Sequence, residues 1–417
     1  MIQKPRGTQD IFGQDAKQWS ALENKLKNIL AKFNYSEIRT PIFEAKELFV
    51  RSVGETSDVV SKEMYELVDK KGREFVLRPE GTASIVRSLV ENKLYAPEYL
   101  PFKVFYIGPM FRYERPQVGR NRQFHQLGIE AFGANSFNQD MEIIIIANQI
   151  VKELQLDKNL EIEINYLVTG DARIAYVAEL KKYLQTFELC GDCQIRMVQN
   201  PLRILDCKVD GYKFTNIPDM NIFLSASEQT EFNNLINGLN NLGIKTVINP
   251  KLVRGLDYYT GFIFELKCLS EKLGGQQTII AGGRYNNLVS ELEGPMVPSA
   301  GFGMGLERLL IMLAAENISL ATSDDLDVYT IAVSEKGMQL NQELLFKLRN
   351  AGIKADTDLM NRSFKSAFKQ ADKFKAHNVI VIGDKEYESR KLQVKNQFTK
   401  QNTILAIEEL INNLKGE

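Results

Sequence analysis

Two long strand-like stretches, residues 102–113 and 122–132, flank a loop rich in arginine, proline and glycine. Strands joined by a short polar loop pair with each other, so these stretches predict a long antiparallel hairpin. Apolar residues with a helical period surround the hairpin in sequence and predict helices over residues 10–33, 81–94 and 140–154. The first part of the chain is therefore expected to combine an antiparallel sheet with helices.

The rest of this first region shows further strands and one change of pattern. Residues 37–43 have strand character, but Pro41 lacks a backbone donor, which favours an edge strand or a bend. From about residue 170 to 249 the pattern becomes helical with short connections, which indicates an insertion. Strand character then returns at 252–266 and 278–281, and a glycine-rich strand at 301–305 leads into an apolar helix at 306–315.

A short polar break, Thr322 to Asp325, separates a second pattern from the first. The residues after it alternate as β-α-β-α-β, with strands at 328–333, 353–357 and 379–383 and helices at 340–350 and 364–376. A chain of 417 residues exceeds what one hydrophobic core usually supports. We therefore expect a first domain over 1–321, interrupted by the insertion at 170–249, and a small α/β domain over 326–417.

Composition excludes several classes of protein. Hydrophobic residues make up 44% of the chain and charged residues 25%, which is typical of globular proteins. The longest aliphatic run, Ile143 to Ala147, is far below the ~20 residues of a membrane span, and residues 1–10 lack the apolar core of a secretory signal. We expect a cytoplasmic protein without membrane contact. Its net charge of -1 means that nucleic-acid contacts must come from local patches.

One face of the predicted strand 122–132 has an unusual composition. Alternation places Phe124, Gln126, Gly128 and Glu130 on one side and His125 with its apolar neighbours on the other. A ring, an amide, a glycine and a carboxylate together are typical of a ligand-binding surface, although an irregular half-exposed strand would show the same pattern. His125 fits a packed core residue better than a catalytic base.

The hairpin loop concentrates positive charge. Arg112, Arg115, Arg120 and Arg122 lie near one turn, and guanidinium groups bind phosphate oxygens in pairs of hydrogen bonds. The loop is either a clamp for polyphosphate or nucleic acid, or a solubilising surface loop. No Walker lysine motif and no dinucleotide-binding glycine motif is present.

Residues 252–259 place Arg254, Asp257 and two tyrosines among apolar neighbours. Buried charges are paired or functional, so Arg254 and Asp257 either form a structural ion pair or face a ligand.

On the predicted helix 364–376, Lys365, Lys369 and Lys373 form one basic face, which is either solvated or in contact with RNA.

The cysteines offer an incomplete metal site. Cys190, Cys193 and Cys207 supply three possible thiolates, but the chain has only two histidines, His125 and His377, and neither is near in sequence. Structural zinc sites need four ligands, so we expect no protein zinc site.

These segments together resemble class II aminoacyl-tRNA synthetases, and specifically histidyl-tRNA synthetase, over essentially the whole chain. Residues 37–43 resemble motif 1, the dimer element with its proline; residues 111–130 resemble motif 2; and residues 303–308 resemble motif 3. Residues 252–259 and 281–285 resemble the two segments specific to the histidine enzyme. The resemblance implies an α+β class II synthetase catalytic domain built on an antiparallel sheet, with a helical insertion and a C-terminal α/β anticodon-binding domain.

The resemblance also implies roles for matching residues. It implies an ATP-dependent ligase that forms histidyl-adenylate with Mg²⁺ and then charges tRNA(His), acting as a homodimer. ATP would be bound by Arg112, Arg120, Phe124 and Arg308, and catalysis would depend on Arg254 and Arg112. Histidine would contact Glu80, Thr82, Gln126, Glu130, Arg254, Tyr258 and Tyr259, and tRNA would contact Arg115, Gln117, Lys365 and Lys369.

Two points set this sequence apart from the usual pattern of the family. Asn286-Asn287 replaces a frequent Asp-Gly, and Phe262 replaces a small polar residue, which puts a turn and the pocket wall in question. The alternative function is a non-catalytic paralogue that regulates another enzyme or senses tRNA. The regulatory paralogue would lack the C-terminal domain and much of the catalytic set, and this sequence has both. The tRNA-sensing module would be fused to a protein kinase, and this sequence has no kinase segment and keeps the arginines expected to bind ATP.

Overall fold

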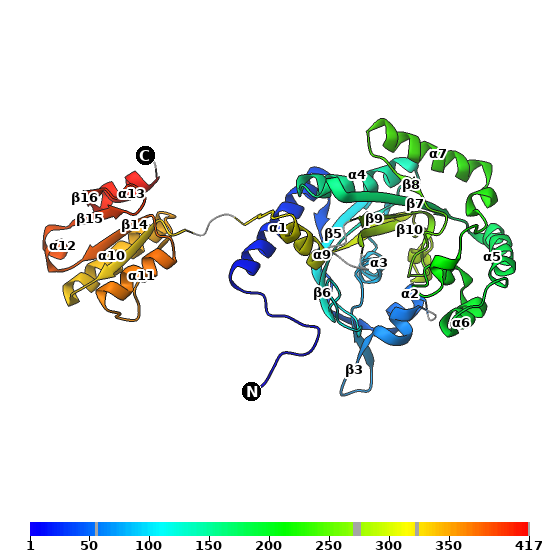
Figure 1. Cartoon of the computed structure of the whole chain (residues 1–417), viewed down its shortest axis with the longest axis horizontal. Coiled ribbons are helices and arrows are strands. Elements are labelled where there is room, and N and C mark those ends of the chain that lie inside the picture. Colours follow the sequence, from blue (N-terminus) through cyan, green and yellow to red (C-terminus); the bar gives the residue numbers. More distant parts are fainter. Residues whose placement is uncertain (55–56, 270–276, 322–324, 416–417) are drawn as a thin grey trace. The chain divides into compact units, whose positions relative to one another are not determined.

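The computed structural model describes residues 1–54, 57–269, 277–321 and 325–415. The chain divides into two compact units, Met1–Ala321 and Thr322–Glu417 (Figure 1). Of the predicted polar break, Thr322, Ser323 and Asp324 lie outside the described residues.

An eight-stranded sheet forms the centre of the first unit, in the order β1-β5-β6-β11-β10-β9-β7-β8. β5 and β6 pair antiparallel along their whole length, which confirms the predicted hairpin. Only the pairs at the two ends of the sheet, β1 with β5 and β7 with β8, are parallel. The strands are β1 (Ser36–Glu37), β5 (Phe102–Phe111), β6 (Gln123–Phe132), β7 (Leu160–Leu167), β8 (Val247–Ile248), β9 (Thr260–Cys268), β10 (Thr278–Arg284) and β11 (Ser299–Gly305).

Helices α1 (Gly13–Lys32), α4 (Phe137–Glu153) and α9 (Leu306–Ala315) cover one face of this sheet, and α7 (Ala226–Asn241) adds Phe232 and Leu235 to the same core. The apolar residues of α1 recur at helical spacing, and Leu22, Leu26 and Ile29 are fully buried. They form one hydrophobic core with Leu127 and Ile129 of β6. Phe262 also lies in this helix-covered core, so it is no part of a pocket wall on the opposite face.

The opposite face of the sheet carries the smaller elements. α3 (Thr82–Glu91) packs there, and beside it lies a small sheet of β2 (Phe43–Ala45), β4 (Glu74–Leu77) and β3 (Tyr65–Val68), with α2 (Lys46–Val53). Residues 37–43 were expected to form an edge strand or a bend, and the bend is confirmed. The chain bends around Pro41, and β1 and β2 belong to different sheets. Two short helical turns, Val59–Glu63 and Pro97–Tyr99, and helix α8 (Leu288–Glu291) complete this side.

Helices also dominate residues 170–249, as predicted. The main ones are α5 (Gly170–Leu184), α6 (Gly191–Gln199) and α7 (Ala226–Asn241), with 3₁₀ turns at Pro201–Ile204, Gly211–Lys213 and Met220–Phe223 between α6 and α7. A further 3₁₀ turn, Asp157–Asn159, precedes β7. A capping box of Ser225 and Glu228 begins α7. Tyr176 and Leu180 of α5 share a hydrophobic core with the sheet residues Val104 and Ile263. α5 and α6 are therefore packed against the face of the sheet that carries α3, whereas Phe232 and Leu235 of α7 lie in the core of the opposite face.

The second unit is a five-stranded sheet in the order β13-β12-β14-β15-β16. Its first part confirms the predicted β-α-β-α-β alternation, with β12 (Val328–Ala332), α10 (Glu335–Asn350), β13 (Ala355–Thr357), α11 (Phe364–Lys373) and β14 (Asn378–Ile382). Added to it are α12 (Asp384–Ser389), an antiparallel pair of β15 (Lys391–Asn396) and β16 (Asn402–Ala406), and α13 (Ile407–Lys415). Among the described helices of the chain, none combines the length and apolar character that a membrane span requires.

Candidate active site

The polar face of β6 forms the centre of the candidate site. Leu127 and Ile129 point into the core under α1 and α9, while Phe124 lies with the hydrophobic residues of the opposite face. The backbone N–H of His125 donates to Glu307 at 2.8 Å, and its ring packs edge-on against Trp19. His125 is thus a structural residue, and the predicted alternation along β6 is confirmed.

Glycines leave room for the polar and aromatic side chains of this face. A Cβ atom at Gly301 would collide with the carboxylate of Glu130, and one at Gly303 would collide with the amide of Gln126. Gly128 similarly leaves room for the ring of Tyr106, which lies opposite it on β5. The pocket therefore depends on the absence of side chains on β11 and β6.

Buried carboxylates lie at one end of the pocket. Glu130 is 1% exposed and accepts hydrogen bonds from Thr82 Oγ1, at 2.7 Å, and from the Tyr285 hydroxyl. Burial raises the pKa of Glu130 to about 8. Glu80 is also buried, which raises its pKa, and it accepts from the backbone N–H groups of Thr82 and Ala83 at 2.7 and 2.8 Å. It thus caps the first turn of α3.

Tyrosines form the wall around Glu130. The rings of Tyr258 and Tyr259 lie 4.7 Å apart, and Tyr258 contacts Tyr285 at 5.6 Å between centroids. The Tyr106 hydroxyl donates to Gln126 Oε1 at 3.4 Å. Tyr106 and Tyr285 were not among the predicted site residues. Tyr285 ends the segment 281–285, which resembles a segment specific to the histidine enzyme. Tyr106 lies directly across from Gly128, so the pairing of the two hairpin strands is the signal that could have identified it.

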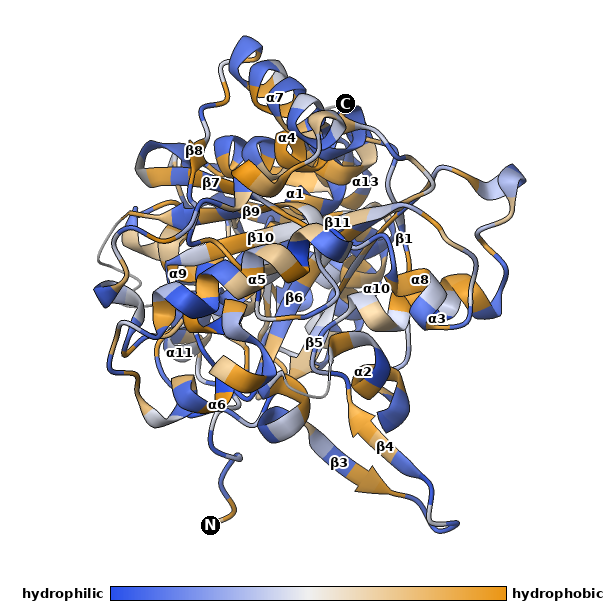
Figure 2. Cartoon of the chain, turned by 90° about the vertical axis from the view of Figure 1, so that its right-hand side faces the viewer, coloured by the Kyte–Doolittle hydropathy of each residue, from blue (hydrophilic) through white to orange (hydrophobic). Residues whose placement is uncertain are grey.

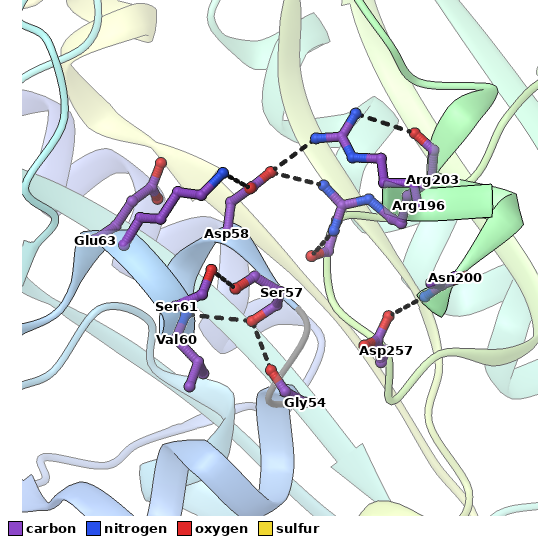
Figure 3. A network of polar contacts seen from close by, with 12 residues as sticks. Gly54, Ser57, Asp58, Val60, Ser61, Glu63, Arg196, Asn200, Arg203 and Asp257 are labelled. Carbon is purple, nitrogen blue, oxygen red and sulfur yellow. Dashed lines mark hydrogen bonds and ion pairs between the residues drawn. The ribbon is translucent and has the colours of Figure 1, made fainter. Parts of the chain in front are cut away.

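Arg254 borders the pocket beside the tyrosines. Its guanidinium pairs with Glu265 and lies 5.4 Å from the centroid of the Tyr259 ring. Glu265 also accepts from Thr278 Oγ1 at 2.8 Å. Asp257 instead accepts from Asn200 Nδ2 at 2.8 Å (Figure 3), so the proposed structural pair of Arg254 with Asp257 is wrong.

Three arginines gather at the other end of the site. Arg112 donates to the Pro79 carbonyl at 2.8 Å, and its guanidinium lies 5.4 Å from the centroid of the Phe124 ring. Arg308 donates to the Gly119 carbonyl at 3.2 Å. Burial, and then the charges of Arg112 and Arg120, lower the pKa of Arg308. Arg120 also pairs with Glu114 and, at 3.7 Å, with Glu63. Guanidinium groups this close together can bind the oxygens of a polyphosphate.

The remaining predicted residues lie elsewhere. Arg115 and Gln117 are exposed on the hairpin loop, and Lys365 and Lys369 are exposed on α11 of the second unit. Cys190, Cys193 and Cys207 come together, and a fourth group lies beside them. It is Asp210, whose carboxylate is a possible fourth ligand that the sequence analysis does not name.

The site can thus hold a small polar ligand at the carboxylate end and a nucleoside triphosphate at the arginine end. These groups lie on one face of an antiparallel sheet. The motif 1 segment precedes them in the sequence, and the glycine-rich strand β11 and helix α9 with Arg308 follow them. This arrangement defines a class II aminoacyl-tRNA synthetase.

Similarity to known proteins identifies the member of this class. A family described as "Histidyl-tRNA synthetase" matches residues 7–174 and 217–309, and one described as "Anticodon binding domain" matches residues 327–417. The chain belongs to the histidyl-tRNA synthetase family. It is 53% identical to the histidine–tRNA ligase of Mycoplasma capricolum over 100% of both chains, and 44% identical to that of Halothermothrix orenii over 99% of both. A crystal structure of apo S. aureus histidyl-tRNA synthetase superposes with a TM-score of 0.85, at 38% identity and full coverage of both chains.

Proposed function

We propose that this pocket carries both steps of a histidine–tRNA ligase. A carboxylate oxygen of histidine attacks the α-phosphorus of ATP, and the bond from that phosphorus to the pyrophosphate leaving group breaks. The terminal ribose hydroxyl of the tRNA then attacks the acyl carbon of histidyl-adenylate and releases AMP. Neither step needs a protein nucleophile, because alignment and neutralisation of charge lower the barrier.

The observation that carries this proposal is the buried Glu130 between Thr82 and Tyr285, on the same sheet face as the arginines. Imidazole offers one donor and one acceptor, so a carboxylate and the Tyr259 hydroxyl can read its two nitrogens. Tyr258 supports Tyr259 through ring contact. Glu80, Thr82 and Gln126 are assigned to the amino and carboxylate ends of the substrate.

ATP is assigned to the other end. Phe124 offers a ring for the adenine, Arg112 and Arg308 offer charge to the phosphates, and Arg120 on the hairpin loop reaches the outer phosphates. Arg254 is assigned to the α-phosphate, where negative charge develops. Mg²⁺ would supply further neutralisation of the phosphates. We assign Glu265 to Mg²⁺, because it offers the carboxylate oxygen that Mg²⁺ prefers and contacts Arg254, which is assigned to the α-phosphate.

The tRNA(His) contacts are assigned to exposed residues. Arg115 and Gln117 on the hairpin loop would meet the acceptor end, and Lys365 and Lys369 on α11 would meet the anticodon arm. We assign residues 326–417 to the anticodon-binding domain and residues 170–249 to an insertion in the catalytic domain 1–321. We place this enzyme in the cytoplasm, where charged tRNA is consumed.

A homodimer is supported by apolar surface around the motif 1 segment. Ile42, Phe43, Leu67 and Val68 are between 45% and 68% exposed, although they belong to or adjoin the small sheet. Figure 2 shows hydrophobic colour on β3 and β4, which project from the body of the unit. Adjacent exposed apolar residues of this kind mark interaction surfaces.

An amino-acid-dependent exchange of pyrophosphate into ATP tests the function. We expect histidine alone, out of a panel of amino acids, to support exchange, because apolar analogues would leave Glu130 and the tyrosines unpaired. A non-catalytic paralogue would show no exchange with any amino acid. A different synthetase would respond to another member of the panel.

A further inference from the structure

Three cysteines and one aspartate of the inserted region lie around a common point. Cys190, Cys193, Cys207 and Asp210 each offer one ligand atom, and these atoms all lie within 4.8 Å of one another. We propose that these four residues bind one structural zinc ion. Neither ATP nor histidine recognition uses these residues, and they fall in the part of the chain that the synthetase family leaves unmatched, between residues 174 and 217.

The spacing of the four residues is typical of a zinc site. Cys190-x-x-Cys193 is followed by Cys207-x-x-Asp210, so each half supplies two ligands three positions apart. Zinc sites use such paired turns, and carboxylate oxygen is an accepted fourth ligand beside thiolates. The first pair spans the start of α6, where Cys190 precedes the helix. The second pair lies in the connection after the Pro201–Ile204 turn.

The distances agree with tetrahedral coordination. The sulfur atoms of Cys190 and Cys207 are 3.9 Å apart. Zn–S bonds of ~2.3 Å at the tetrahedral angle would separate two sulfur ligands by about 3.8 Å. Cys190, Cys193 and Cys207 are free thiols, and Cys193 and Cys207 are buried. A divalent cation bound here would offset the negative charge of the carboxylate and of the thiolates that form on binding.

The groups around the cluster hold the ligands in place. The carboxylate of Asp210 accepts from the backbone N–H of Cys190 at 2.9 Å and from Lys213 Nζ at 2.7 Å. The backbone N–H of Asp210 donates to the sulfur of Cys207 at 3.4 Å. Hydrogen bonds of this kind orient metal ligands from outside the coordination sphere. Asp210 is fully buried, so these contacts fix the position of its carboxylate beside the sulfur atoms.

The cluster joins the two ends of a segment that contacts the candidate active site. Residues 194–206 lie between the two ligand pairs, and Figure 3 shows Arg196 and Arg203 directed at Asp58 and Asn200 directed at Asp257. Arg203 also donates to the Gly255 carbonyl at 2.8 Å. Zinc would thus fix the segment that holds residues 254–259. The effect of zinc on residues 254–259 depends on the proposed function, whereas zinc binding by the four ligands does not.

Metal content tests the site directly. The full-length protein, incubated with Zn²⁺ and then freed of loose metal by gel filtration, should retain about one zinc ion per chain. Cys207→Ser and Asp210→Asn should each lower the retained zinc at least about tenfold. Cys268→Ala is the matched control, because Cys268 is also buried but lies in the other core, and it should retain the metal. Equal zinc in wild type and Cys207→Ser, or none in wild type, would overturn the proposal.

A cobalt titration keeps the test valid if a variant fails to fold. Wild-type protein stripped of metal should, on addition of Co²⁺, develop thiolate-to-cobalt charge-transfer bands and the visible bands of tetrahedral cobalt. Octahedral cobalt without thiolate bands would overturn the assignment.

The link to the pocket has a separate readout. Asp210→Asn should raise the Michaelis constant for histidine several-fold and leave that for ATP nearly unchanged, because Asn200 and Arg203 hold the loop of Tyr258 and Tyr259. Unchanged constants in a zinc-free variant would refute the link while the metal assignment stands. Loss of all exchange in the zinc-loaded wild type would instead refute the proposed function.

Discussion

Glu130 combines deep burial with two hydroxyl donors and no cationic partner among its described contacts. Around neutral pH its carboxyl group is largely protonated, because burial raises its pKa to about 8. An imidazole bound beside it can share this proton, and the result is a charge-assisted hydrogen bond in a dry site.

Glu130→Gln keeps the shape of the side chain but removes this charged interaction. We expect the variant to lose ~1.5 to 3 kcal/mol of histidine affinity, seen as a higher Michaelis constant for histidine in pyrophosphate exchange. The constant for ATP should change little and serves as the internal control. If only the Michaelis constant for ATP rises, the assignment of Glu130 to histidine binding is wrong.

The same residue makes stability depend on pH. Between about pH 4.5 and pH 8 the folded protein keeps a proton on Glu130 that the unfolded chain has lost, so the free energy of unfolding falls as pH rises through this window. The slope for one such group is ~1.4 kcal/mol per pH unit. Urea unfolding of Glu130→Gln should give a shallower fall than wild type, and at pH 8 a more stable protein. Parallel curves would show that Glu130 is ionised in the free enzyme.

Arg254 is assigned to a charge that develops during adenylation, yet it also pairs with Glu265. Arg254→Ala should slow exchange by ~10² to 10³. It should also lower stability, since Glu265 loses its ion pair. The double variant Arg254→Ala/Glu265→Gln should recover thermal stability but not rate. If the rate returns with the stability, Arg254 has only a structural role.

At the level of elements, regular patterns were predicted well and loops poorly. β5, β6, β11 and α9 follow from alternation, helical period and glycine spacing, and their predicted limits agree with the structure to within a few residues. The expected strand character over 252–266 is wrong for residues 252–259, since β9 begins only at Thr260. Tertiary contacts to Asn200 and Arg203 fix this loop instead. No local pattern encodes such contacts. The same reason explains why the ion pair of Arg254 with Glu265, on the following strand, was not predicted.

Helix α11 separates an apolar face from a basic one. Ala367 and Ala371 are buried against β12, whereas Lys365, Lys369 and Lys373 are exposed. If these lysines meet phosphates, changing all three to Gln should lower the slope of log affinity for tRNA against log salt by about 2. The exposed Lys336, Lys385 and Lys400, changed together, provide a control of equal charge in the same unit. Equal slopes for the two triple variants would show that the lysines of α11 face solvent and do not contact tRNA phosphates.

At the level of the whole molecule, the two units have separate hydrophobic cores. All residues assigned to ATP and histidine lie in Met1–Ala321. A protein that ends at Ala321 should therefore retain pyrophosphate exchange but charge tRNA(His) far more slowly, as measured with radiolabelled histidine. Circular dichroism would verify that the shortened chain is folded. Full charging by the folded fragment would contradict the anticodon role of residues 326–417.

The order of the central sheet also has a consequence for synthesis of the chain. β6 lies between β5, its neighbour in sequence, and β11, which the ribosome adds much later. Glu130 pairs across this boundary with Gly301, and its partner Tyr285 also comes from the late half. A nascent chain thus carries half a pocket, open to water, until β11 emerges. Closing so long a loop is slow, and substrates that bridge the boundary would favour the closed sheet by mass action. Histidine and ATP would then act on the maturing enzyme as folding ligands before they serve as substrates.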